Sequence, residues 1–495
     1  MSGSDPGWVR RQELVLRAEQ SRVVTTIFLP GQDKAFAGES RSSAVLERIL
    51  ALPEVDVQQT LSDIMTGFEG RHRDLQGTWA GHGELLEHRL VGAGPLSPAR
   101  RQLIGAYFTQ EYAIESAALC NPSMVEHPDQ TGVPPGAIRF LMTARGIGEG
   151  HISSLEFRTG LVDARDALEL DPQPQLATLP TALPTEYSRS EFAAQLRDIG
   201  GDRSNSDFVL DLLPDNFTRQ ELEGALSELR LQRLTRGAAP RTIERFERMA
   251  ANTYAVEFPT ESTVQERVLM PRGPAESHGL EDARMVRFQA SGGSTSYVGT
   301  YTAYDGRNVT SQLISTPNFR TFTVDQLSGP GAKNKGLALF PRQVGGRYLA
   351  VSRADRESNA LSFSSDLRHW ERPELLQAPR QAWEIVQLGN CGPPIETDAG
   401  WLVLTHGVGP MRTYGIGALL LDLSDPSLIL GQLRRPFLTP AADERSGYVP
   451  NVVYSCGGLL HGRTLVLPYG CSDSAIRFAM VSLDHLLGEL LEPAA

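Results

Sequence analysis

The sequence of 495 residues has few cysteines and no long apolar stretch. It contains four cysteines, Cys120, Cys391, Cys456 and Cys471. They fall in no zinc-binding spacing and are too few for a disulfide framework in a chain of this size, so we expect reduced thiols in the core. The start of the chain lacks a charged segment followed by an apolar one, and nowhere do about 18 apolar residues follow one another. These absences predict a cytoplasmic protein without a membrane partner.

Positive charge is also scarce. Lys and Arg number 47 against 59 Asp and Glu, which leaves a net charge of −12, and no basic run stands out. Nucleic acids and acidic membranes are therefore poor candidate partners. The chain has no glycine-rich nucleotide motif, no GxSxG sequence and no cluster of His and Cys that resembles a metal site. We therefore expect no cofactor and no metal, and acid and base chemistry on an uncharged polar substrate is what remains.

A pattern that the sequence does contain occurs five times: an apolar strand, a polar loop and a second strand. The copies lie at 139–157, 297–315, 348–363, 401–421 and 464–479. The last three begin about 50 to 60 residues apart, which is the spacing of propeller blades. The first strands of the copies end in side chains that can bind or react, namely Arg145, Tyr304, Arg353, His406 and Tyr469. In a propeller the innermost strands point their ends at one axial opening, so we expect these side chains to converge there.

Two regions interrupt this pattern. Apolar residues at three- and four-residue spacing predict amphipathic helices from about 43 to 120. A second helical stretch begins at Ser188 or Ser190 and includes a capping box of Thr218 and Glu221. The predicted fold is thus mainly β, a five-bladed β-propeller with an N-terminal helical extension and a helical insertion. Its expected parts are a largely helical N-terminal segment (1–120), a first blade (121–187), the insertion (188–250) and the remaining blades (251–495).

The chemistry is concentrated at Glu281 and Asp282, which stand next to Arg284. An isolated Glu-Asp pair is commonly a surface turn. In an extended segment, however, alternation sends the two carboxylates to opposite faces, so that Arg284 can hold one while the other faces the pocket. A carboxyl group that faces a low-dielectric cavity has a raised pKa, which suits a general acid.

Glu396 supplies a further carboxylate ahead of the strand that carries His406, and Lys335 and Arg353 supply cations. Charged residues are usually solvated, and a single His at the end of an apolar strand is more often structural than catalytic. The expected convergence of the strand ends on one pocket nevertheless favours a common site.

The run from Gly279 to Arg284 resembles the Gly-x-Glu-Asp-Pro-Arg motif of glycoside hydrolase family 130, the β-mannoside phosphorylases and β-mannosidases built on a five-bladed β-propeller. Further segments match the family in order: Asn121-Pro-Ser, Arg145, 301–305, 334–341, 364–370, 392–395, 400–407, 421–426, Tyr469-Gly470 and Asp473. The resemblance covers the chain from about Asn121 onward, apart from the helical insertion. It implies that Asp282 is the general acid that protonates the glycosidic oxygen. It also implies that the nonreducing mannosyl unit is held by Asn121, Arg145, Asp305 and Asp473.

Two departures from the family pattern bear on the reaction type. Phosphorylases of the family hold phosphate with basic side chains, and their segment that resembles 392–395 normally continues with Lys, where this chain has Glu396. A carboxylate there would repel phosphate. An Arg that phosphorylases often carry after Tyr-Asp is also replaced, by the segment 309–312. Inverting hydrolysis needs an acid and a base roughly 6.5 to 9.5 Å apart, with water between the base and the anomeric carbon. The sequence therefore favours a β-mannosidase that acts from the nonreducing end, with Asp282 as acid and Glu396 as base.

Two alternatives stay open. Arg353, His406 and Lys335 could bind inorganic phosphate as the co-substrate of a β-mannoside phosphorylase, and Glu396 would then be a structural partner of Arg353. A carbohydrate-binding propeller without turnover is less favoured, because binding alone gains nothing from an acid aimed at the leaving oxygen. The expected partner is a β-linked manno-oligosaccharide or mannosyl glycoside. Linkage, aglycone, assembly into a homo-oligomer and the role of the helical additions are not specified by the sequence.

Overall fold

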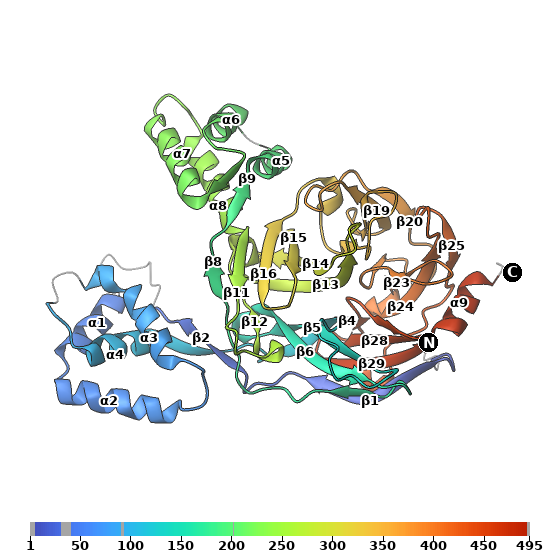
Figure 1. Ribbon diagram of the computed structural model, residues 1–495, viewed down its shortest axis with the longest axis horizontal. Coiled ribbons are helices and arrows are strands. Elements are labelled where there is room, and N and C mark those ends of the chain that lie inside the picture. Colours follow the sequence, from blue (N-terminus) through green and yellow to red (C-terminus); the bar gives the residue numbers. More distant parts are fainter. Residues whose placement is uncertain (1–4, 31–40, 91–93, 201, 493–495) are drawn as a thin grey trace.

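The computed structural model describes residues 5–30, 41–90, 94–200 and 202–492. Parts of the predicted N-terminal segment (1–4, 31–40 and 91–93) and residue 201 of the predicted insertion lie outside the described residues. Within the described ranges the chain is mainly β, as predicted, and most helices fall into two groups. Figure 1 shows both groups projecting from one side of a larger β body. No helix in these ranges is long and apolar enough to cross a membrane.

In the described residues of the first helical group, four α-helices accompany one strand pair. The helices are α1 (Arg41–Ala51), α2 (Glu54–Gly67), α3 (Leu75–Glu84) and α4 (Pro98–Tyr107). Beyond α4, strand β3 (Thr109–Ala113) pairs antiparallel with β2 (Val23–Ile27). The prediction of helix up to residue 120 is therefore wrong after Tyr107. The backbone of β3 bonds to β2 instead, with Tyr112 opposite Val24, and β-branched and aromatic residues favour such a pairing.

All five predicted copies of the strand pattern are antiparallel strand pairs. They are β5 (Ile138–Ile147) with β6 (Ser153–Val162), β14 (Thr295–Tyr304) with β15 (Val309–Thr316), β18 (Tyr348–Ser352) with β19 (Asn359–Ser364), β23 (Trp401–Val408) with β24 (Tyr414–Leu421), and β28 (Thr464–Cys471) with β29 (Ala475–Ser482). Strand β23 is buried along its whole length, which indicates that both faces of its sheet are covered. The loops that follow the first strands are therefore comparable positions in the five pairs.

The five pairs belong to four sheets. The largest has eleven strands, and besides two of the pairs it contains β4 (Ala118–Glu126), β7 (Leu168–Leu170), β8 (Thr181–Leu183), β11 (Tyr254–Glu257), β12 (Val268–Leu269), β13 (Gly279–Gln289) and β16 (Thr321–Gln326). A four-stranded sheet adds β17 (Ala338–Leu339) and β20 (Glu374–Gln377). A five-stranded sheet adds β21 (Gln387–Asn390), β22 (Ile395–Glu396) and β25 (Ile429–Gln432).

The last sheet unites the two ends of the chain. Strand β1 (Val9–Arg17) pairs antiparallel with β29, and the same sheet contains β26 (Val453–Tyr454) and β27 (Leu459–His461). In Figure 1 the N-terminus and β1 lie beside β29. The N-terminal segment therefore contributes a strand to the β body, which the sequence pattern did not indicate. The last helix, α9 (Leu483–Leu491), follows β29 directly.

The second helical group forms its own small core. It consists of β9 (Glu186–Ser188), α5 (Arg189–Ile199), α6 (Arg203–Asp211), β10 (Asn216–Thr218), α7 (Arg219–Leu231) and α8 (Ala239–Ala251). The predicted capping box of Thr218 and Glu221 is present at the start of α7. Gln195 and Asn252 both donate hydrogen bonds to Gln326 of β16. These contacts attach the group to the end of strand β16, which lies between β15 and β11 in the largest sheet.

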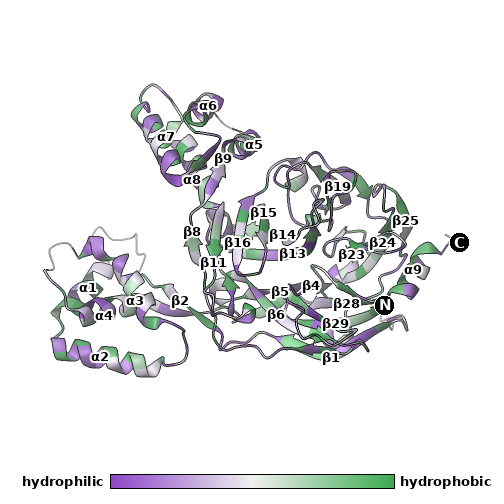
Figure 2. Ribbon diagram, in the orientation of Figure 1, coloured by the Kyte–Doolittle hydropathy of each residue, from purple (hydrophilic) through white to green (hydrophobic). Residues whose placement is uncertain are grey.

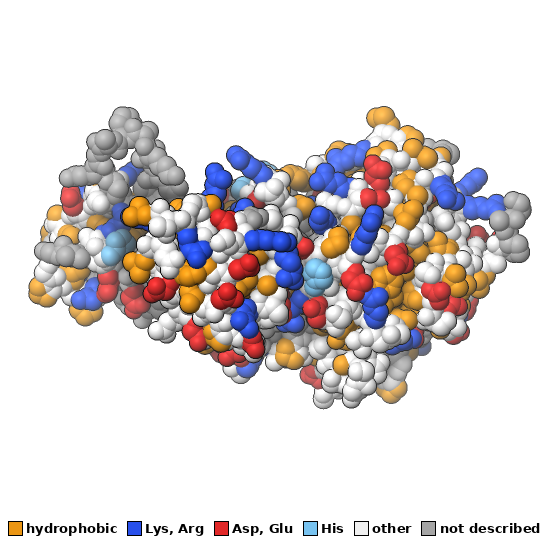
Figure 3. Space-filling model, turned by 90° about the horizontal axis from the view of Figure 1, so that it is seen from above, with side chains coloured by type: hydrophobic (Ala, Val, Ile, Leu, Met, Phe, Trp, Pro, Cys, Tyr) orange, Lys and Arg blue, Asp and Glu red, His pale blue; other side chains and the backbone are white. Residues whose placement is uncertain are grey.

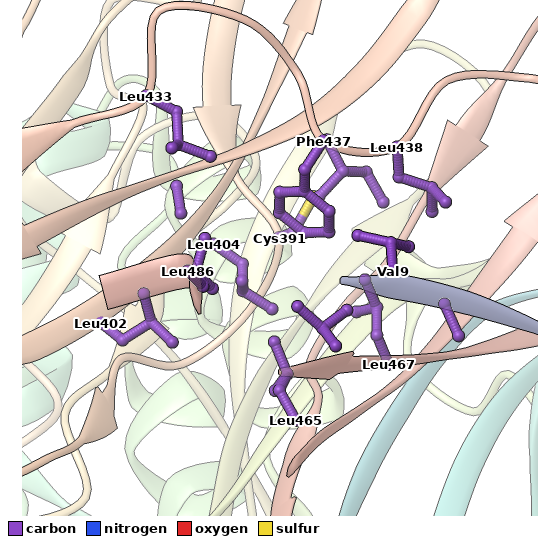
Figure 4. Close-up of a cluster of buried hydrophobic side chains, with 14 of the residues drawn as sticks. Val9, Cys391, Leu402, Leu404, Leu433, Phe437, Leu438, Leu465, Leu467 and Leu486 are labelled. Atoms are coloured by element: carbon purple, nitrogen blue, oxygen red, sulfur yellow. The ribbon is translucent and has the colours of Figure 1, made fainter. Parts of the chain in front are cut away.

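The core of the β body is continuous between sheets. In Figure 4, Val9 of β1 packs near Leu465 and Leu467 of β28, beside Leu404 of β23 and Cys391. All four cysteines are buried and free, as predicted. Hydrophobic residues run along the strands of the body in Figure 2. Acidic and basic side chains are interspersed over the face seen in Figure 3.

Candidate active site

Asp282 lies at an irregularity in strand β13. Its φ is 54°, and the pairing of β13 with β14 shifts register between Glu281 and Arg284. A bulge of this kind adds a residue to one strand and re-aims its side chains, and a positive φ is uncommon outside glycine. The adjacent carboxylates of Glu281 and Asp282 therefore have different surroundings, through a bulge rather than through simple strand alternation.

Glu281 is fixed by two cations. Its Oε1 accepts a hydrogen bond from Nη2 of Arg145 at 2.7 Å, and its Oε2 pairs with Nζ of Lys335. Arg145 comes from β5 and Lys335 from the segment before β17, so three predicted site residues from separate parts of the chain meet here. Glu281 is 7% exposed, and a carboxylate buried to that degree requires such partners. Arg284, which was expected to hold one of the two carboxylates, lies beside Asp282.

The carboxylate of Asp282 lies among cations. Burial raises its pKa, but Arg284, Lys335, Arg145 and Arg353 together hold the pKa of Asp282 below its ordinary value. One carboxylate oxygen is 3.9 Å from Nη2 of Arg284. The raised pKa predicted for this group is therefore wrong, because the surrounding charges outweigh desolvation. Asp282 is ionised at neutral pH.

His406 is buried and joins two other residues of the site. Its Nδ1 lies 3.1 Å from the carbonyl oxygen of Asn390, and its Nε2 lies 3.3 Å from Nη1 of Arg353. A carbonyl only accepts, so Nδ1 carries the proton and Nε2 accepts from Arg353. Burial, with the charge of Arg353 nearby, lowers the pKa of His406 to about 3. The ring is thus neutral, and it orients Arg353.

Arg353 itself forms no ion pair among the residues that the structure describes, although its charge reaches Asp282. Its only side-chain hydrogen bond there is the one to His406, and its Nε is buried without a partner. By contrast, the neighbouring cations Arg145 and Lys335 share Glu281. A part-buried guanidinium without a carboxylate is a costly arrangement unless an anion is bound there.

Asn390 and Tyr454 belong to the site although the sequence did not single them out for it. Arg284 donates from Nε to Oδ1 of Asn390 at 3.2 Å and from Nη2 to the hydroxyl of Tyr454. The ring of Tyr454 meets that of His406 edge to face at 4.9 Å. Asn390 lies just before the segment 392–395 that matches the family, and that segment was a usable signal. Nothing local in the sequence marks Tyr454.

Asn121 and Asp473 both have left-handed backbone conformations, with φ of 47° and 48°. Asn121 is 7% exposed and lies in β4, where the thiol of Cys120 contacts its Oδ1 at 3.1 Å. Burial raises the pKa of Asp473 to about 6, opposed by Arg145 and supported by the negative charge of Asp282. These electrostatic relations place Asp473 in the same cluster as Glu281 and Asp282.

Tyr304 and Asp305 follow the end of β14. The Tyr304 hydroxyl donates to the carbonyl oxygen of Gly306 at 2.8 Å. Asp305 accepts hydrogen bonds from its own loop and pairs with Arg248 of α8 at 2.7 Å. Both side chains therefore hold the loop 304–308, which begins beside Gly279 at the start of β13.

Glu396 and Tyr469 are among the predicted site residues that are not brought to this cluster. Glu396 is 42% exposed and forms a two-pronged ion pair with Arg342, at 2.7 and 2.9 Å. Tyr469 is fully buried, and its hydroxyl donates to Glu444 at 2.8 Å. The pleat of β28 places Tyr469 on the same face as Leu467, which is core, so its side chain does not open toward the other strand-end residues.

A family model and several known proteins are similar to parts of this chain. A family model described as beta-1,4-mannooligosaccharide phosphorylase matches residues 251–492. A 1,2-beta-oligomannan phosphorylase from Thermoanaerobacter sp. (strain X514) is 32% identical over 215 residues, 43% of this chain and 71% of the relative. A beta-1,2-mannobiose phosphorylase from Listeria innocua is 30% identical over 230 residues, 45% of this chain and 63% of the relative.

Among solved structures, the Listeria innocua beta-1,2-mannobiose phosphorylase in complex with beta-1,2-mannobiose is similar over 77% of this chain and 93% of that chain, with a TM-score of 0.46 and 20% identity. The region of the family model contains most of the cluster described above. It includes Glu281, Asp282, Arg284, Lys335, Arg353, Asn390, His406, Tyr454 and Asp473.

Proposed function

We propose that this chain, which belongs to glycoside hydrolase family 130 and is a carbohydrate-active enzyme that acts on mannosides, transfers a terminal β-mannosyl unit to inorganic phosphate. The sequence alone favoured hydrolysis. The relatives described above are named as phosphorylases, which supports the reaction that the sequence analysis kept as its alternative.

The observation that carries this proposal is the state of Arg353. Within the described part of the chain this guanidinium has no carboxylate partner, and neutral His406 holds it beside the cations around Asp282. Phosphate is a suitable anion for such a position, because Arg donates in a planar fork to its oxygens. Lys335 is near enough to lower the pKa of Asp282, and it completes the candidate phosphate site.

Glu396, on which the prediction of hydrolysis was based, forms an ion pair outside the cluster. Glu396 is bound to Arg342 at the surface, so its charge is compensated there and does not repel an anion at Arg353. Glu281 is also committed, to Arg145 and Lys335. We therefore assign Glu396 a structural role in place of the general base that the sequence suggested.

Asp282 is the proposed general acid. Its pKa is lowered because cations surround it. A phosphate dianion bound at Arg353 and Lys335 would offset part of that positive charge, which raises the pKa of Asp282 and favours its protonated form. Binding of phosphate, the nucleophile, would in this way favour protonation of Asp282 before the reaction.

The step then balances as a single displacement with inversion. A phosphate oxygen forms a bond to the anomeric carbon while the bond from that carbon to the glycosidic oxygen breaks. Asp282 gives its proton to the departing oxygen, so the shortened saccharide leaves as an alcohol and Asp282 becomes a carboxylate. Inversion of a β-mannoside yields α-mannose 1-phosphate.

We further propose that Asn121, Arg145 and Asp473 hold the mannosyl unit. Proximity to the acid supports this assignment. Arg145 forms an ion pair with Glu281, and the negative charge of Asp282 helps to raise the pKa of Asp473. The loop that Asp305 stabilises would close one side of that position.

The proposed frame for this site is a five-bladed β-propeller. It is supported by the five antiparallel strand pairs and by β1, which joins β29 in the way that a closing strand completes a last blade. The helical insertion would then extend from the second blade through its contacts with Gln326.

The test is an incubation with β-linked manno-oligosaccharides, with and without inorganic phosphate, followed by identification of the released sugar. Phosphorolysis predicts mannose 1-phosphate and a strict phosphate requirement. Release of free mannose at a rate indifferent to phosphate would contradict the proposal and restore hydrolysis. Both linkages named among the relatives, β-1,2 and β-1,4, should be tried.

A further inference from the structure

Two loops of the β body have the same unusual backbone. Between β5 and β6, Gly148 donates its N–H to the carbonyl oxygen of Ile152 at 3.0 Å, and between β23 and β24, Gly409 donates to Thr413, also at 3.0 Å. In each loop the two residues before the acceptor have positive φ. The angles are 66° at Gly150 and 61° at His151 in the first loop, and 57° at Met411 and 53° at Arg412 in the second. His151 and Arg412 thus occupy equivalent positions in two strand pairs.

His151 meets an exposed aromatic residue from a distant part of the chain. Its ring centroid lies 5.8 Å from that of Tyr448, with the ring planes 35° apart, and the Tyr448 hydroxyl lies 3.3 Å from Nδ1 of His151. Tyr448 is 51% exposed, and His151 is also exposed. The pair therefore presents ring surface to solvent.

This aromatic pair lies next to the proposed mannosyl position. The N–H of Tyr448 donates to Oγ of Ser474 at 2.8 Å, and Ser474 directly follows Asp473. On the other side, Arg412 is near enough for its positive charge to oppose the rise in the pKa of Asp473. His151, Arg412 and Asp473 all lie in the loops that follow the first strands of their pairs.

The pair is poorly explained by stability. Aromatic contacts stabilise mainly through buried area, and both of these residues are exposed. A left-handed conformation at a residue other than glycine is unfavourable, and such strain is commonly found at binding sites. Here the strained conformation holds the imidazole of His151 against Tyr448 at the rim of the site.

We propose that His151 and Tyr448 form a stacking platform for a sugar ring beyond the first one on the leaving-group side of the cleaved bond. The axial C–H bonds of a β-mannopyranose gather on one face, which makes that face apolar and complementary to an aromatic ring. The enzyme then binds longer β-manno-oligosaccharides more tightly than the disaccharide. This inference rests on the proposed cleavage of β-mannosides from the nonreducing end.

The test compares substrates of different length. KM and kcat are measured with phosphate for mannobiose and mannotetraose of the β-1,2 and β-1,4 series, for the wild type and for Tyr448→Ala. The platform predicts that KM for the tetraose rises by about threefold to tenfold more than KM for the disaccharide, the effect of losing one aromatic contact. Tyr448→Phe keeps the ring and should retain the wild-type ratio. Tyr107→Ala, which removes a 46% exposed Tyr at the end of α4, is the matched control.

Calorimetric titration of the ligand-free proteins with the same tetraoses, without phosphate, keeps this inference separate from the proposed reaction. Weaker tetraose binding by folded Tyr448→Ala, and also by His151→Gly, supports the platform even if no mannose 1-phosphate is formed. His151→Gly is chosen because glycine accepts a φ near 61°. Equal tetraose affinity in wild type and Tyr448→Ala, or an unchanged ratio of KM values, would overturn the inference and leave the reaction itself untouched.

Discussion

Arg353 donates a hydrogen bond across 3.3 Å to Nε2 of His406, whose Nδ1 is committed to the carbonyl oxygen of Asn390. This relationship makes the imidazole an acceptor toward the guanidinium, and Arg353 has no second side-chain hydrogen bond within the described part of the chain. Because burial keeps His406 neutral, with a pKa of about 3, the arrangement persists throughout the neutral pH range. The proposed anion site therefore keeps one fixed donor over that range.

Replacement of Arg353 tests that assignment. Arg353→Ala should raise KM for phosphate by about 10-fold to 100-fold, the range expected for the loss of hydrogen bonds to a charged group. Affinity for the saccharide, measured calorimetrically without phosphate, should change much less. Arg342→Ala is the matched control, because Arg342 pairs with Glu396 at the surface. Equal phosphate dependence in Arg353→Ala and the wild type would exclude Arg353 from the phosphate site.

Replacement by Gln should have a small effect on stability and activity at Glu396 and a large effect on stability at Glu281. Glu396→Gln removes a half-exposed ion pair, which contributes at most about 1 kcal/mol to the free energy of unfolding, and activity should stay within about twofold. Glu281→Gln leaves Arg145 and Lys335 without their shared carboxylate, and loss of a buried partner typically costs about 3 kcal/mol or more. Thermal unfolding and steady-state rates measure both. Strong loss of activity in folded Glu396→Gln would return that residue to the role of a base.

Much of the β body could be predicted because its signals are local. Alternating and continuous apolar runs marked all five strand pairs, and Thr218 with Glu221 marked the start of α7. The pairing of β1 with β29 could not be predicted, because Val9 and Val481 carry no local sign of their contact. The incorrect prediction that Tyr469 faces the pocket could have been avoided, since Tyr469 shares a strand face with Leu467.

The proximity of the candidate residues was predicted more accurately than their electrostatics. Glu281 and Arg145 form an ion pair and Asp282 lies within reach of their charges, but the direction of the Asp282 pKa shift was predicted wrongly. Desolvation can be anticipated for one residue, whereas the lowering depends on cations that distant segments bring to the same place. The partner of Glu396 likewise depends on the packing of Arg342 against it.

Asp282→Asn should lower kcat on natural β-mannosides by at least about 100-fold, the usual lower range for loss of a general acid. An aryl mannoside with a good leaving group needs less protonation and should lose less activity. Comparison of the two substrates in the wild type and the variant measures this difference. Equal residual activity on the natural disaccharide would remove Asp282 from the role.

Proton uptake on phosphate binding gives a second measure of the same group. If phosphate raises the pKa of Asp282, the wild type takes up more protons on binding phosphate than Asp282→Asn does, since the amide cannot titrate. Titrations in buffers of different ionisation enthalpy report that number. The same proton count in both proteins would show that phosphate and Asp282 are not coupled.

Saccharide binding should depend on the ionisation of Asp473. Its folded pKa is raised to about 6, so the group is a carboxylate above that pH and becomes protonated as the pH falls through it. A carboxylate accepts stronger hydrogen bonds from sugar hydroxyls than a neutral acid does. Affinity for mannobiose, measured without phosphate so that phosphate itself does not titrate, should therefore weaken as the pH is lowered from about 7.5 to about 5. Asp473→Asn should bind weakly at every pH, with no such transition. An unchanged transition in Asp473→Asn would assign it to another group, and a flat profile in the wild type would show that Asp473 does not bind the sugar through its charge.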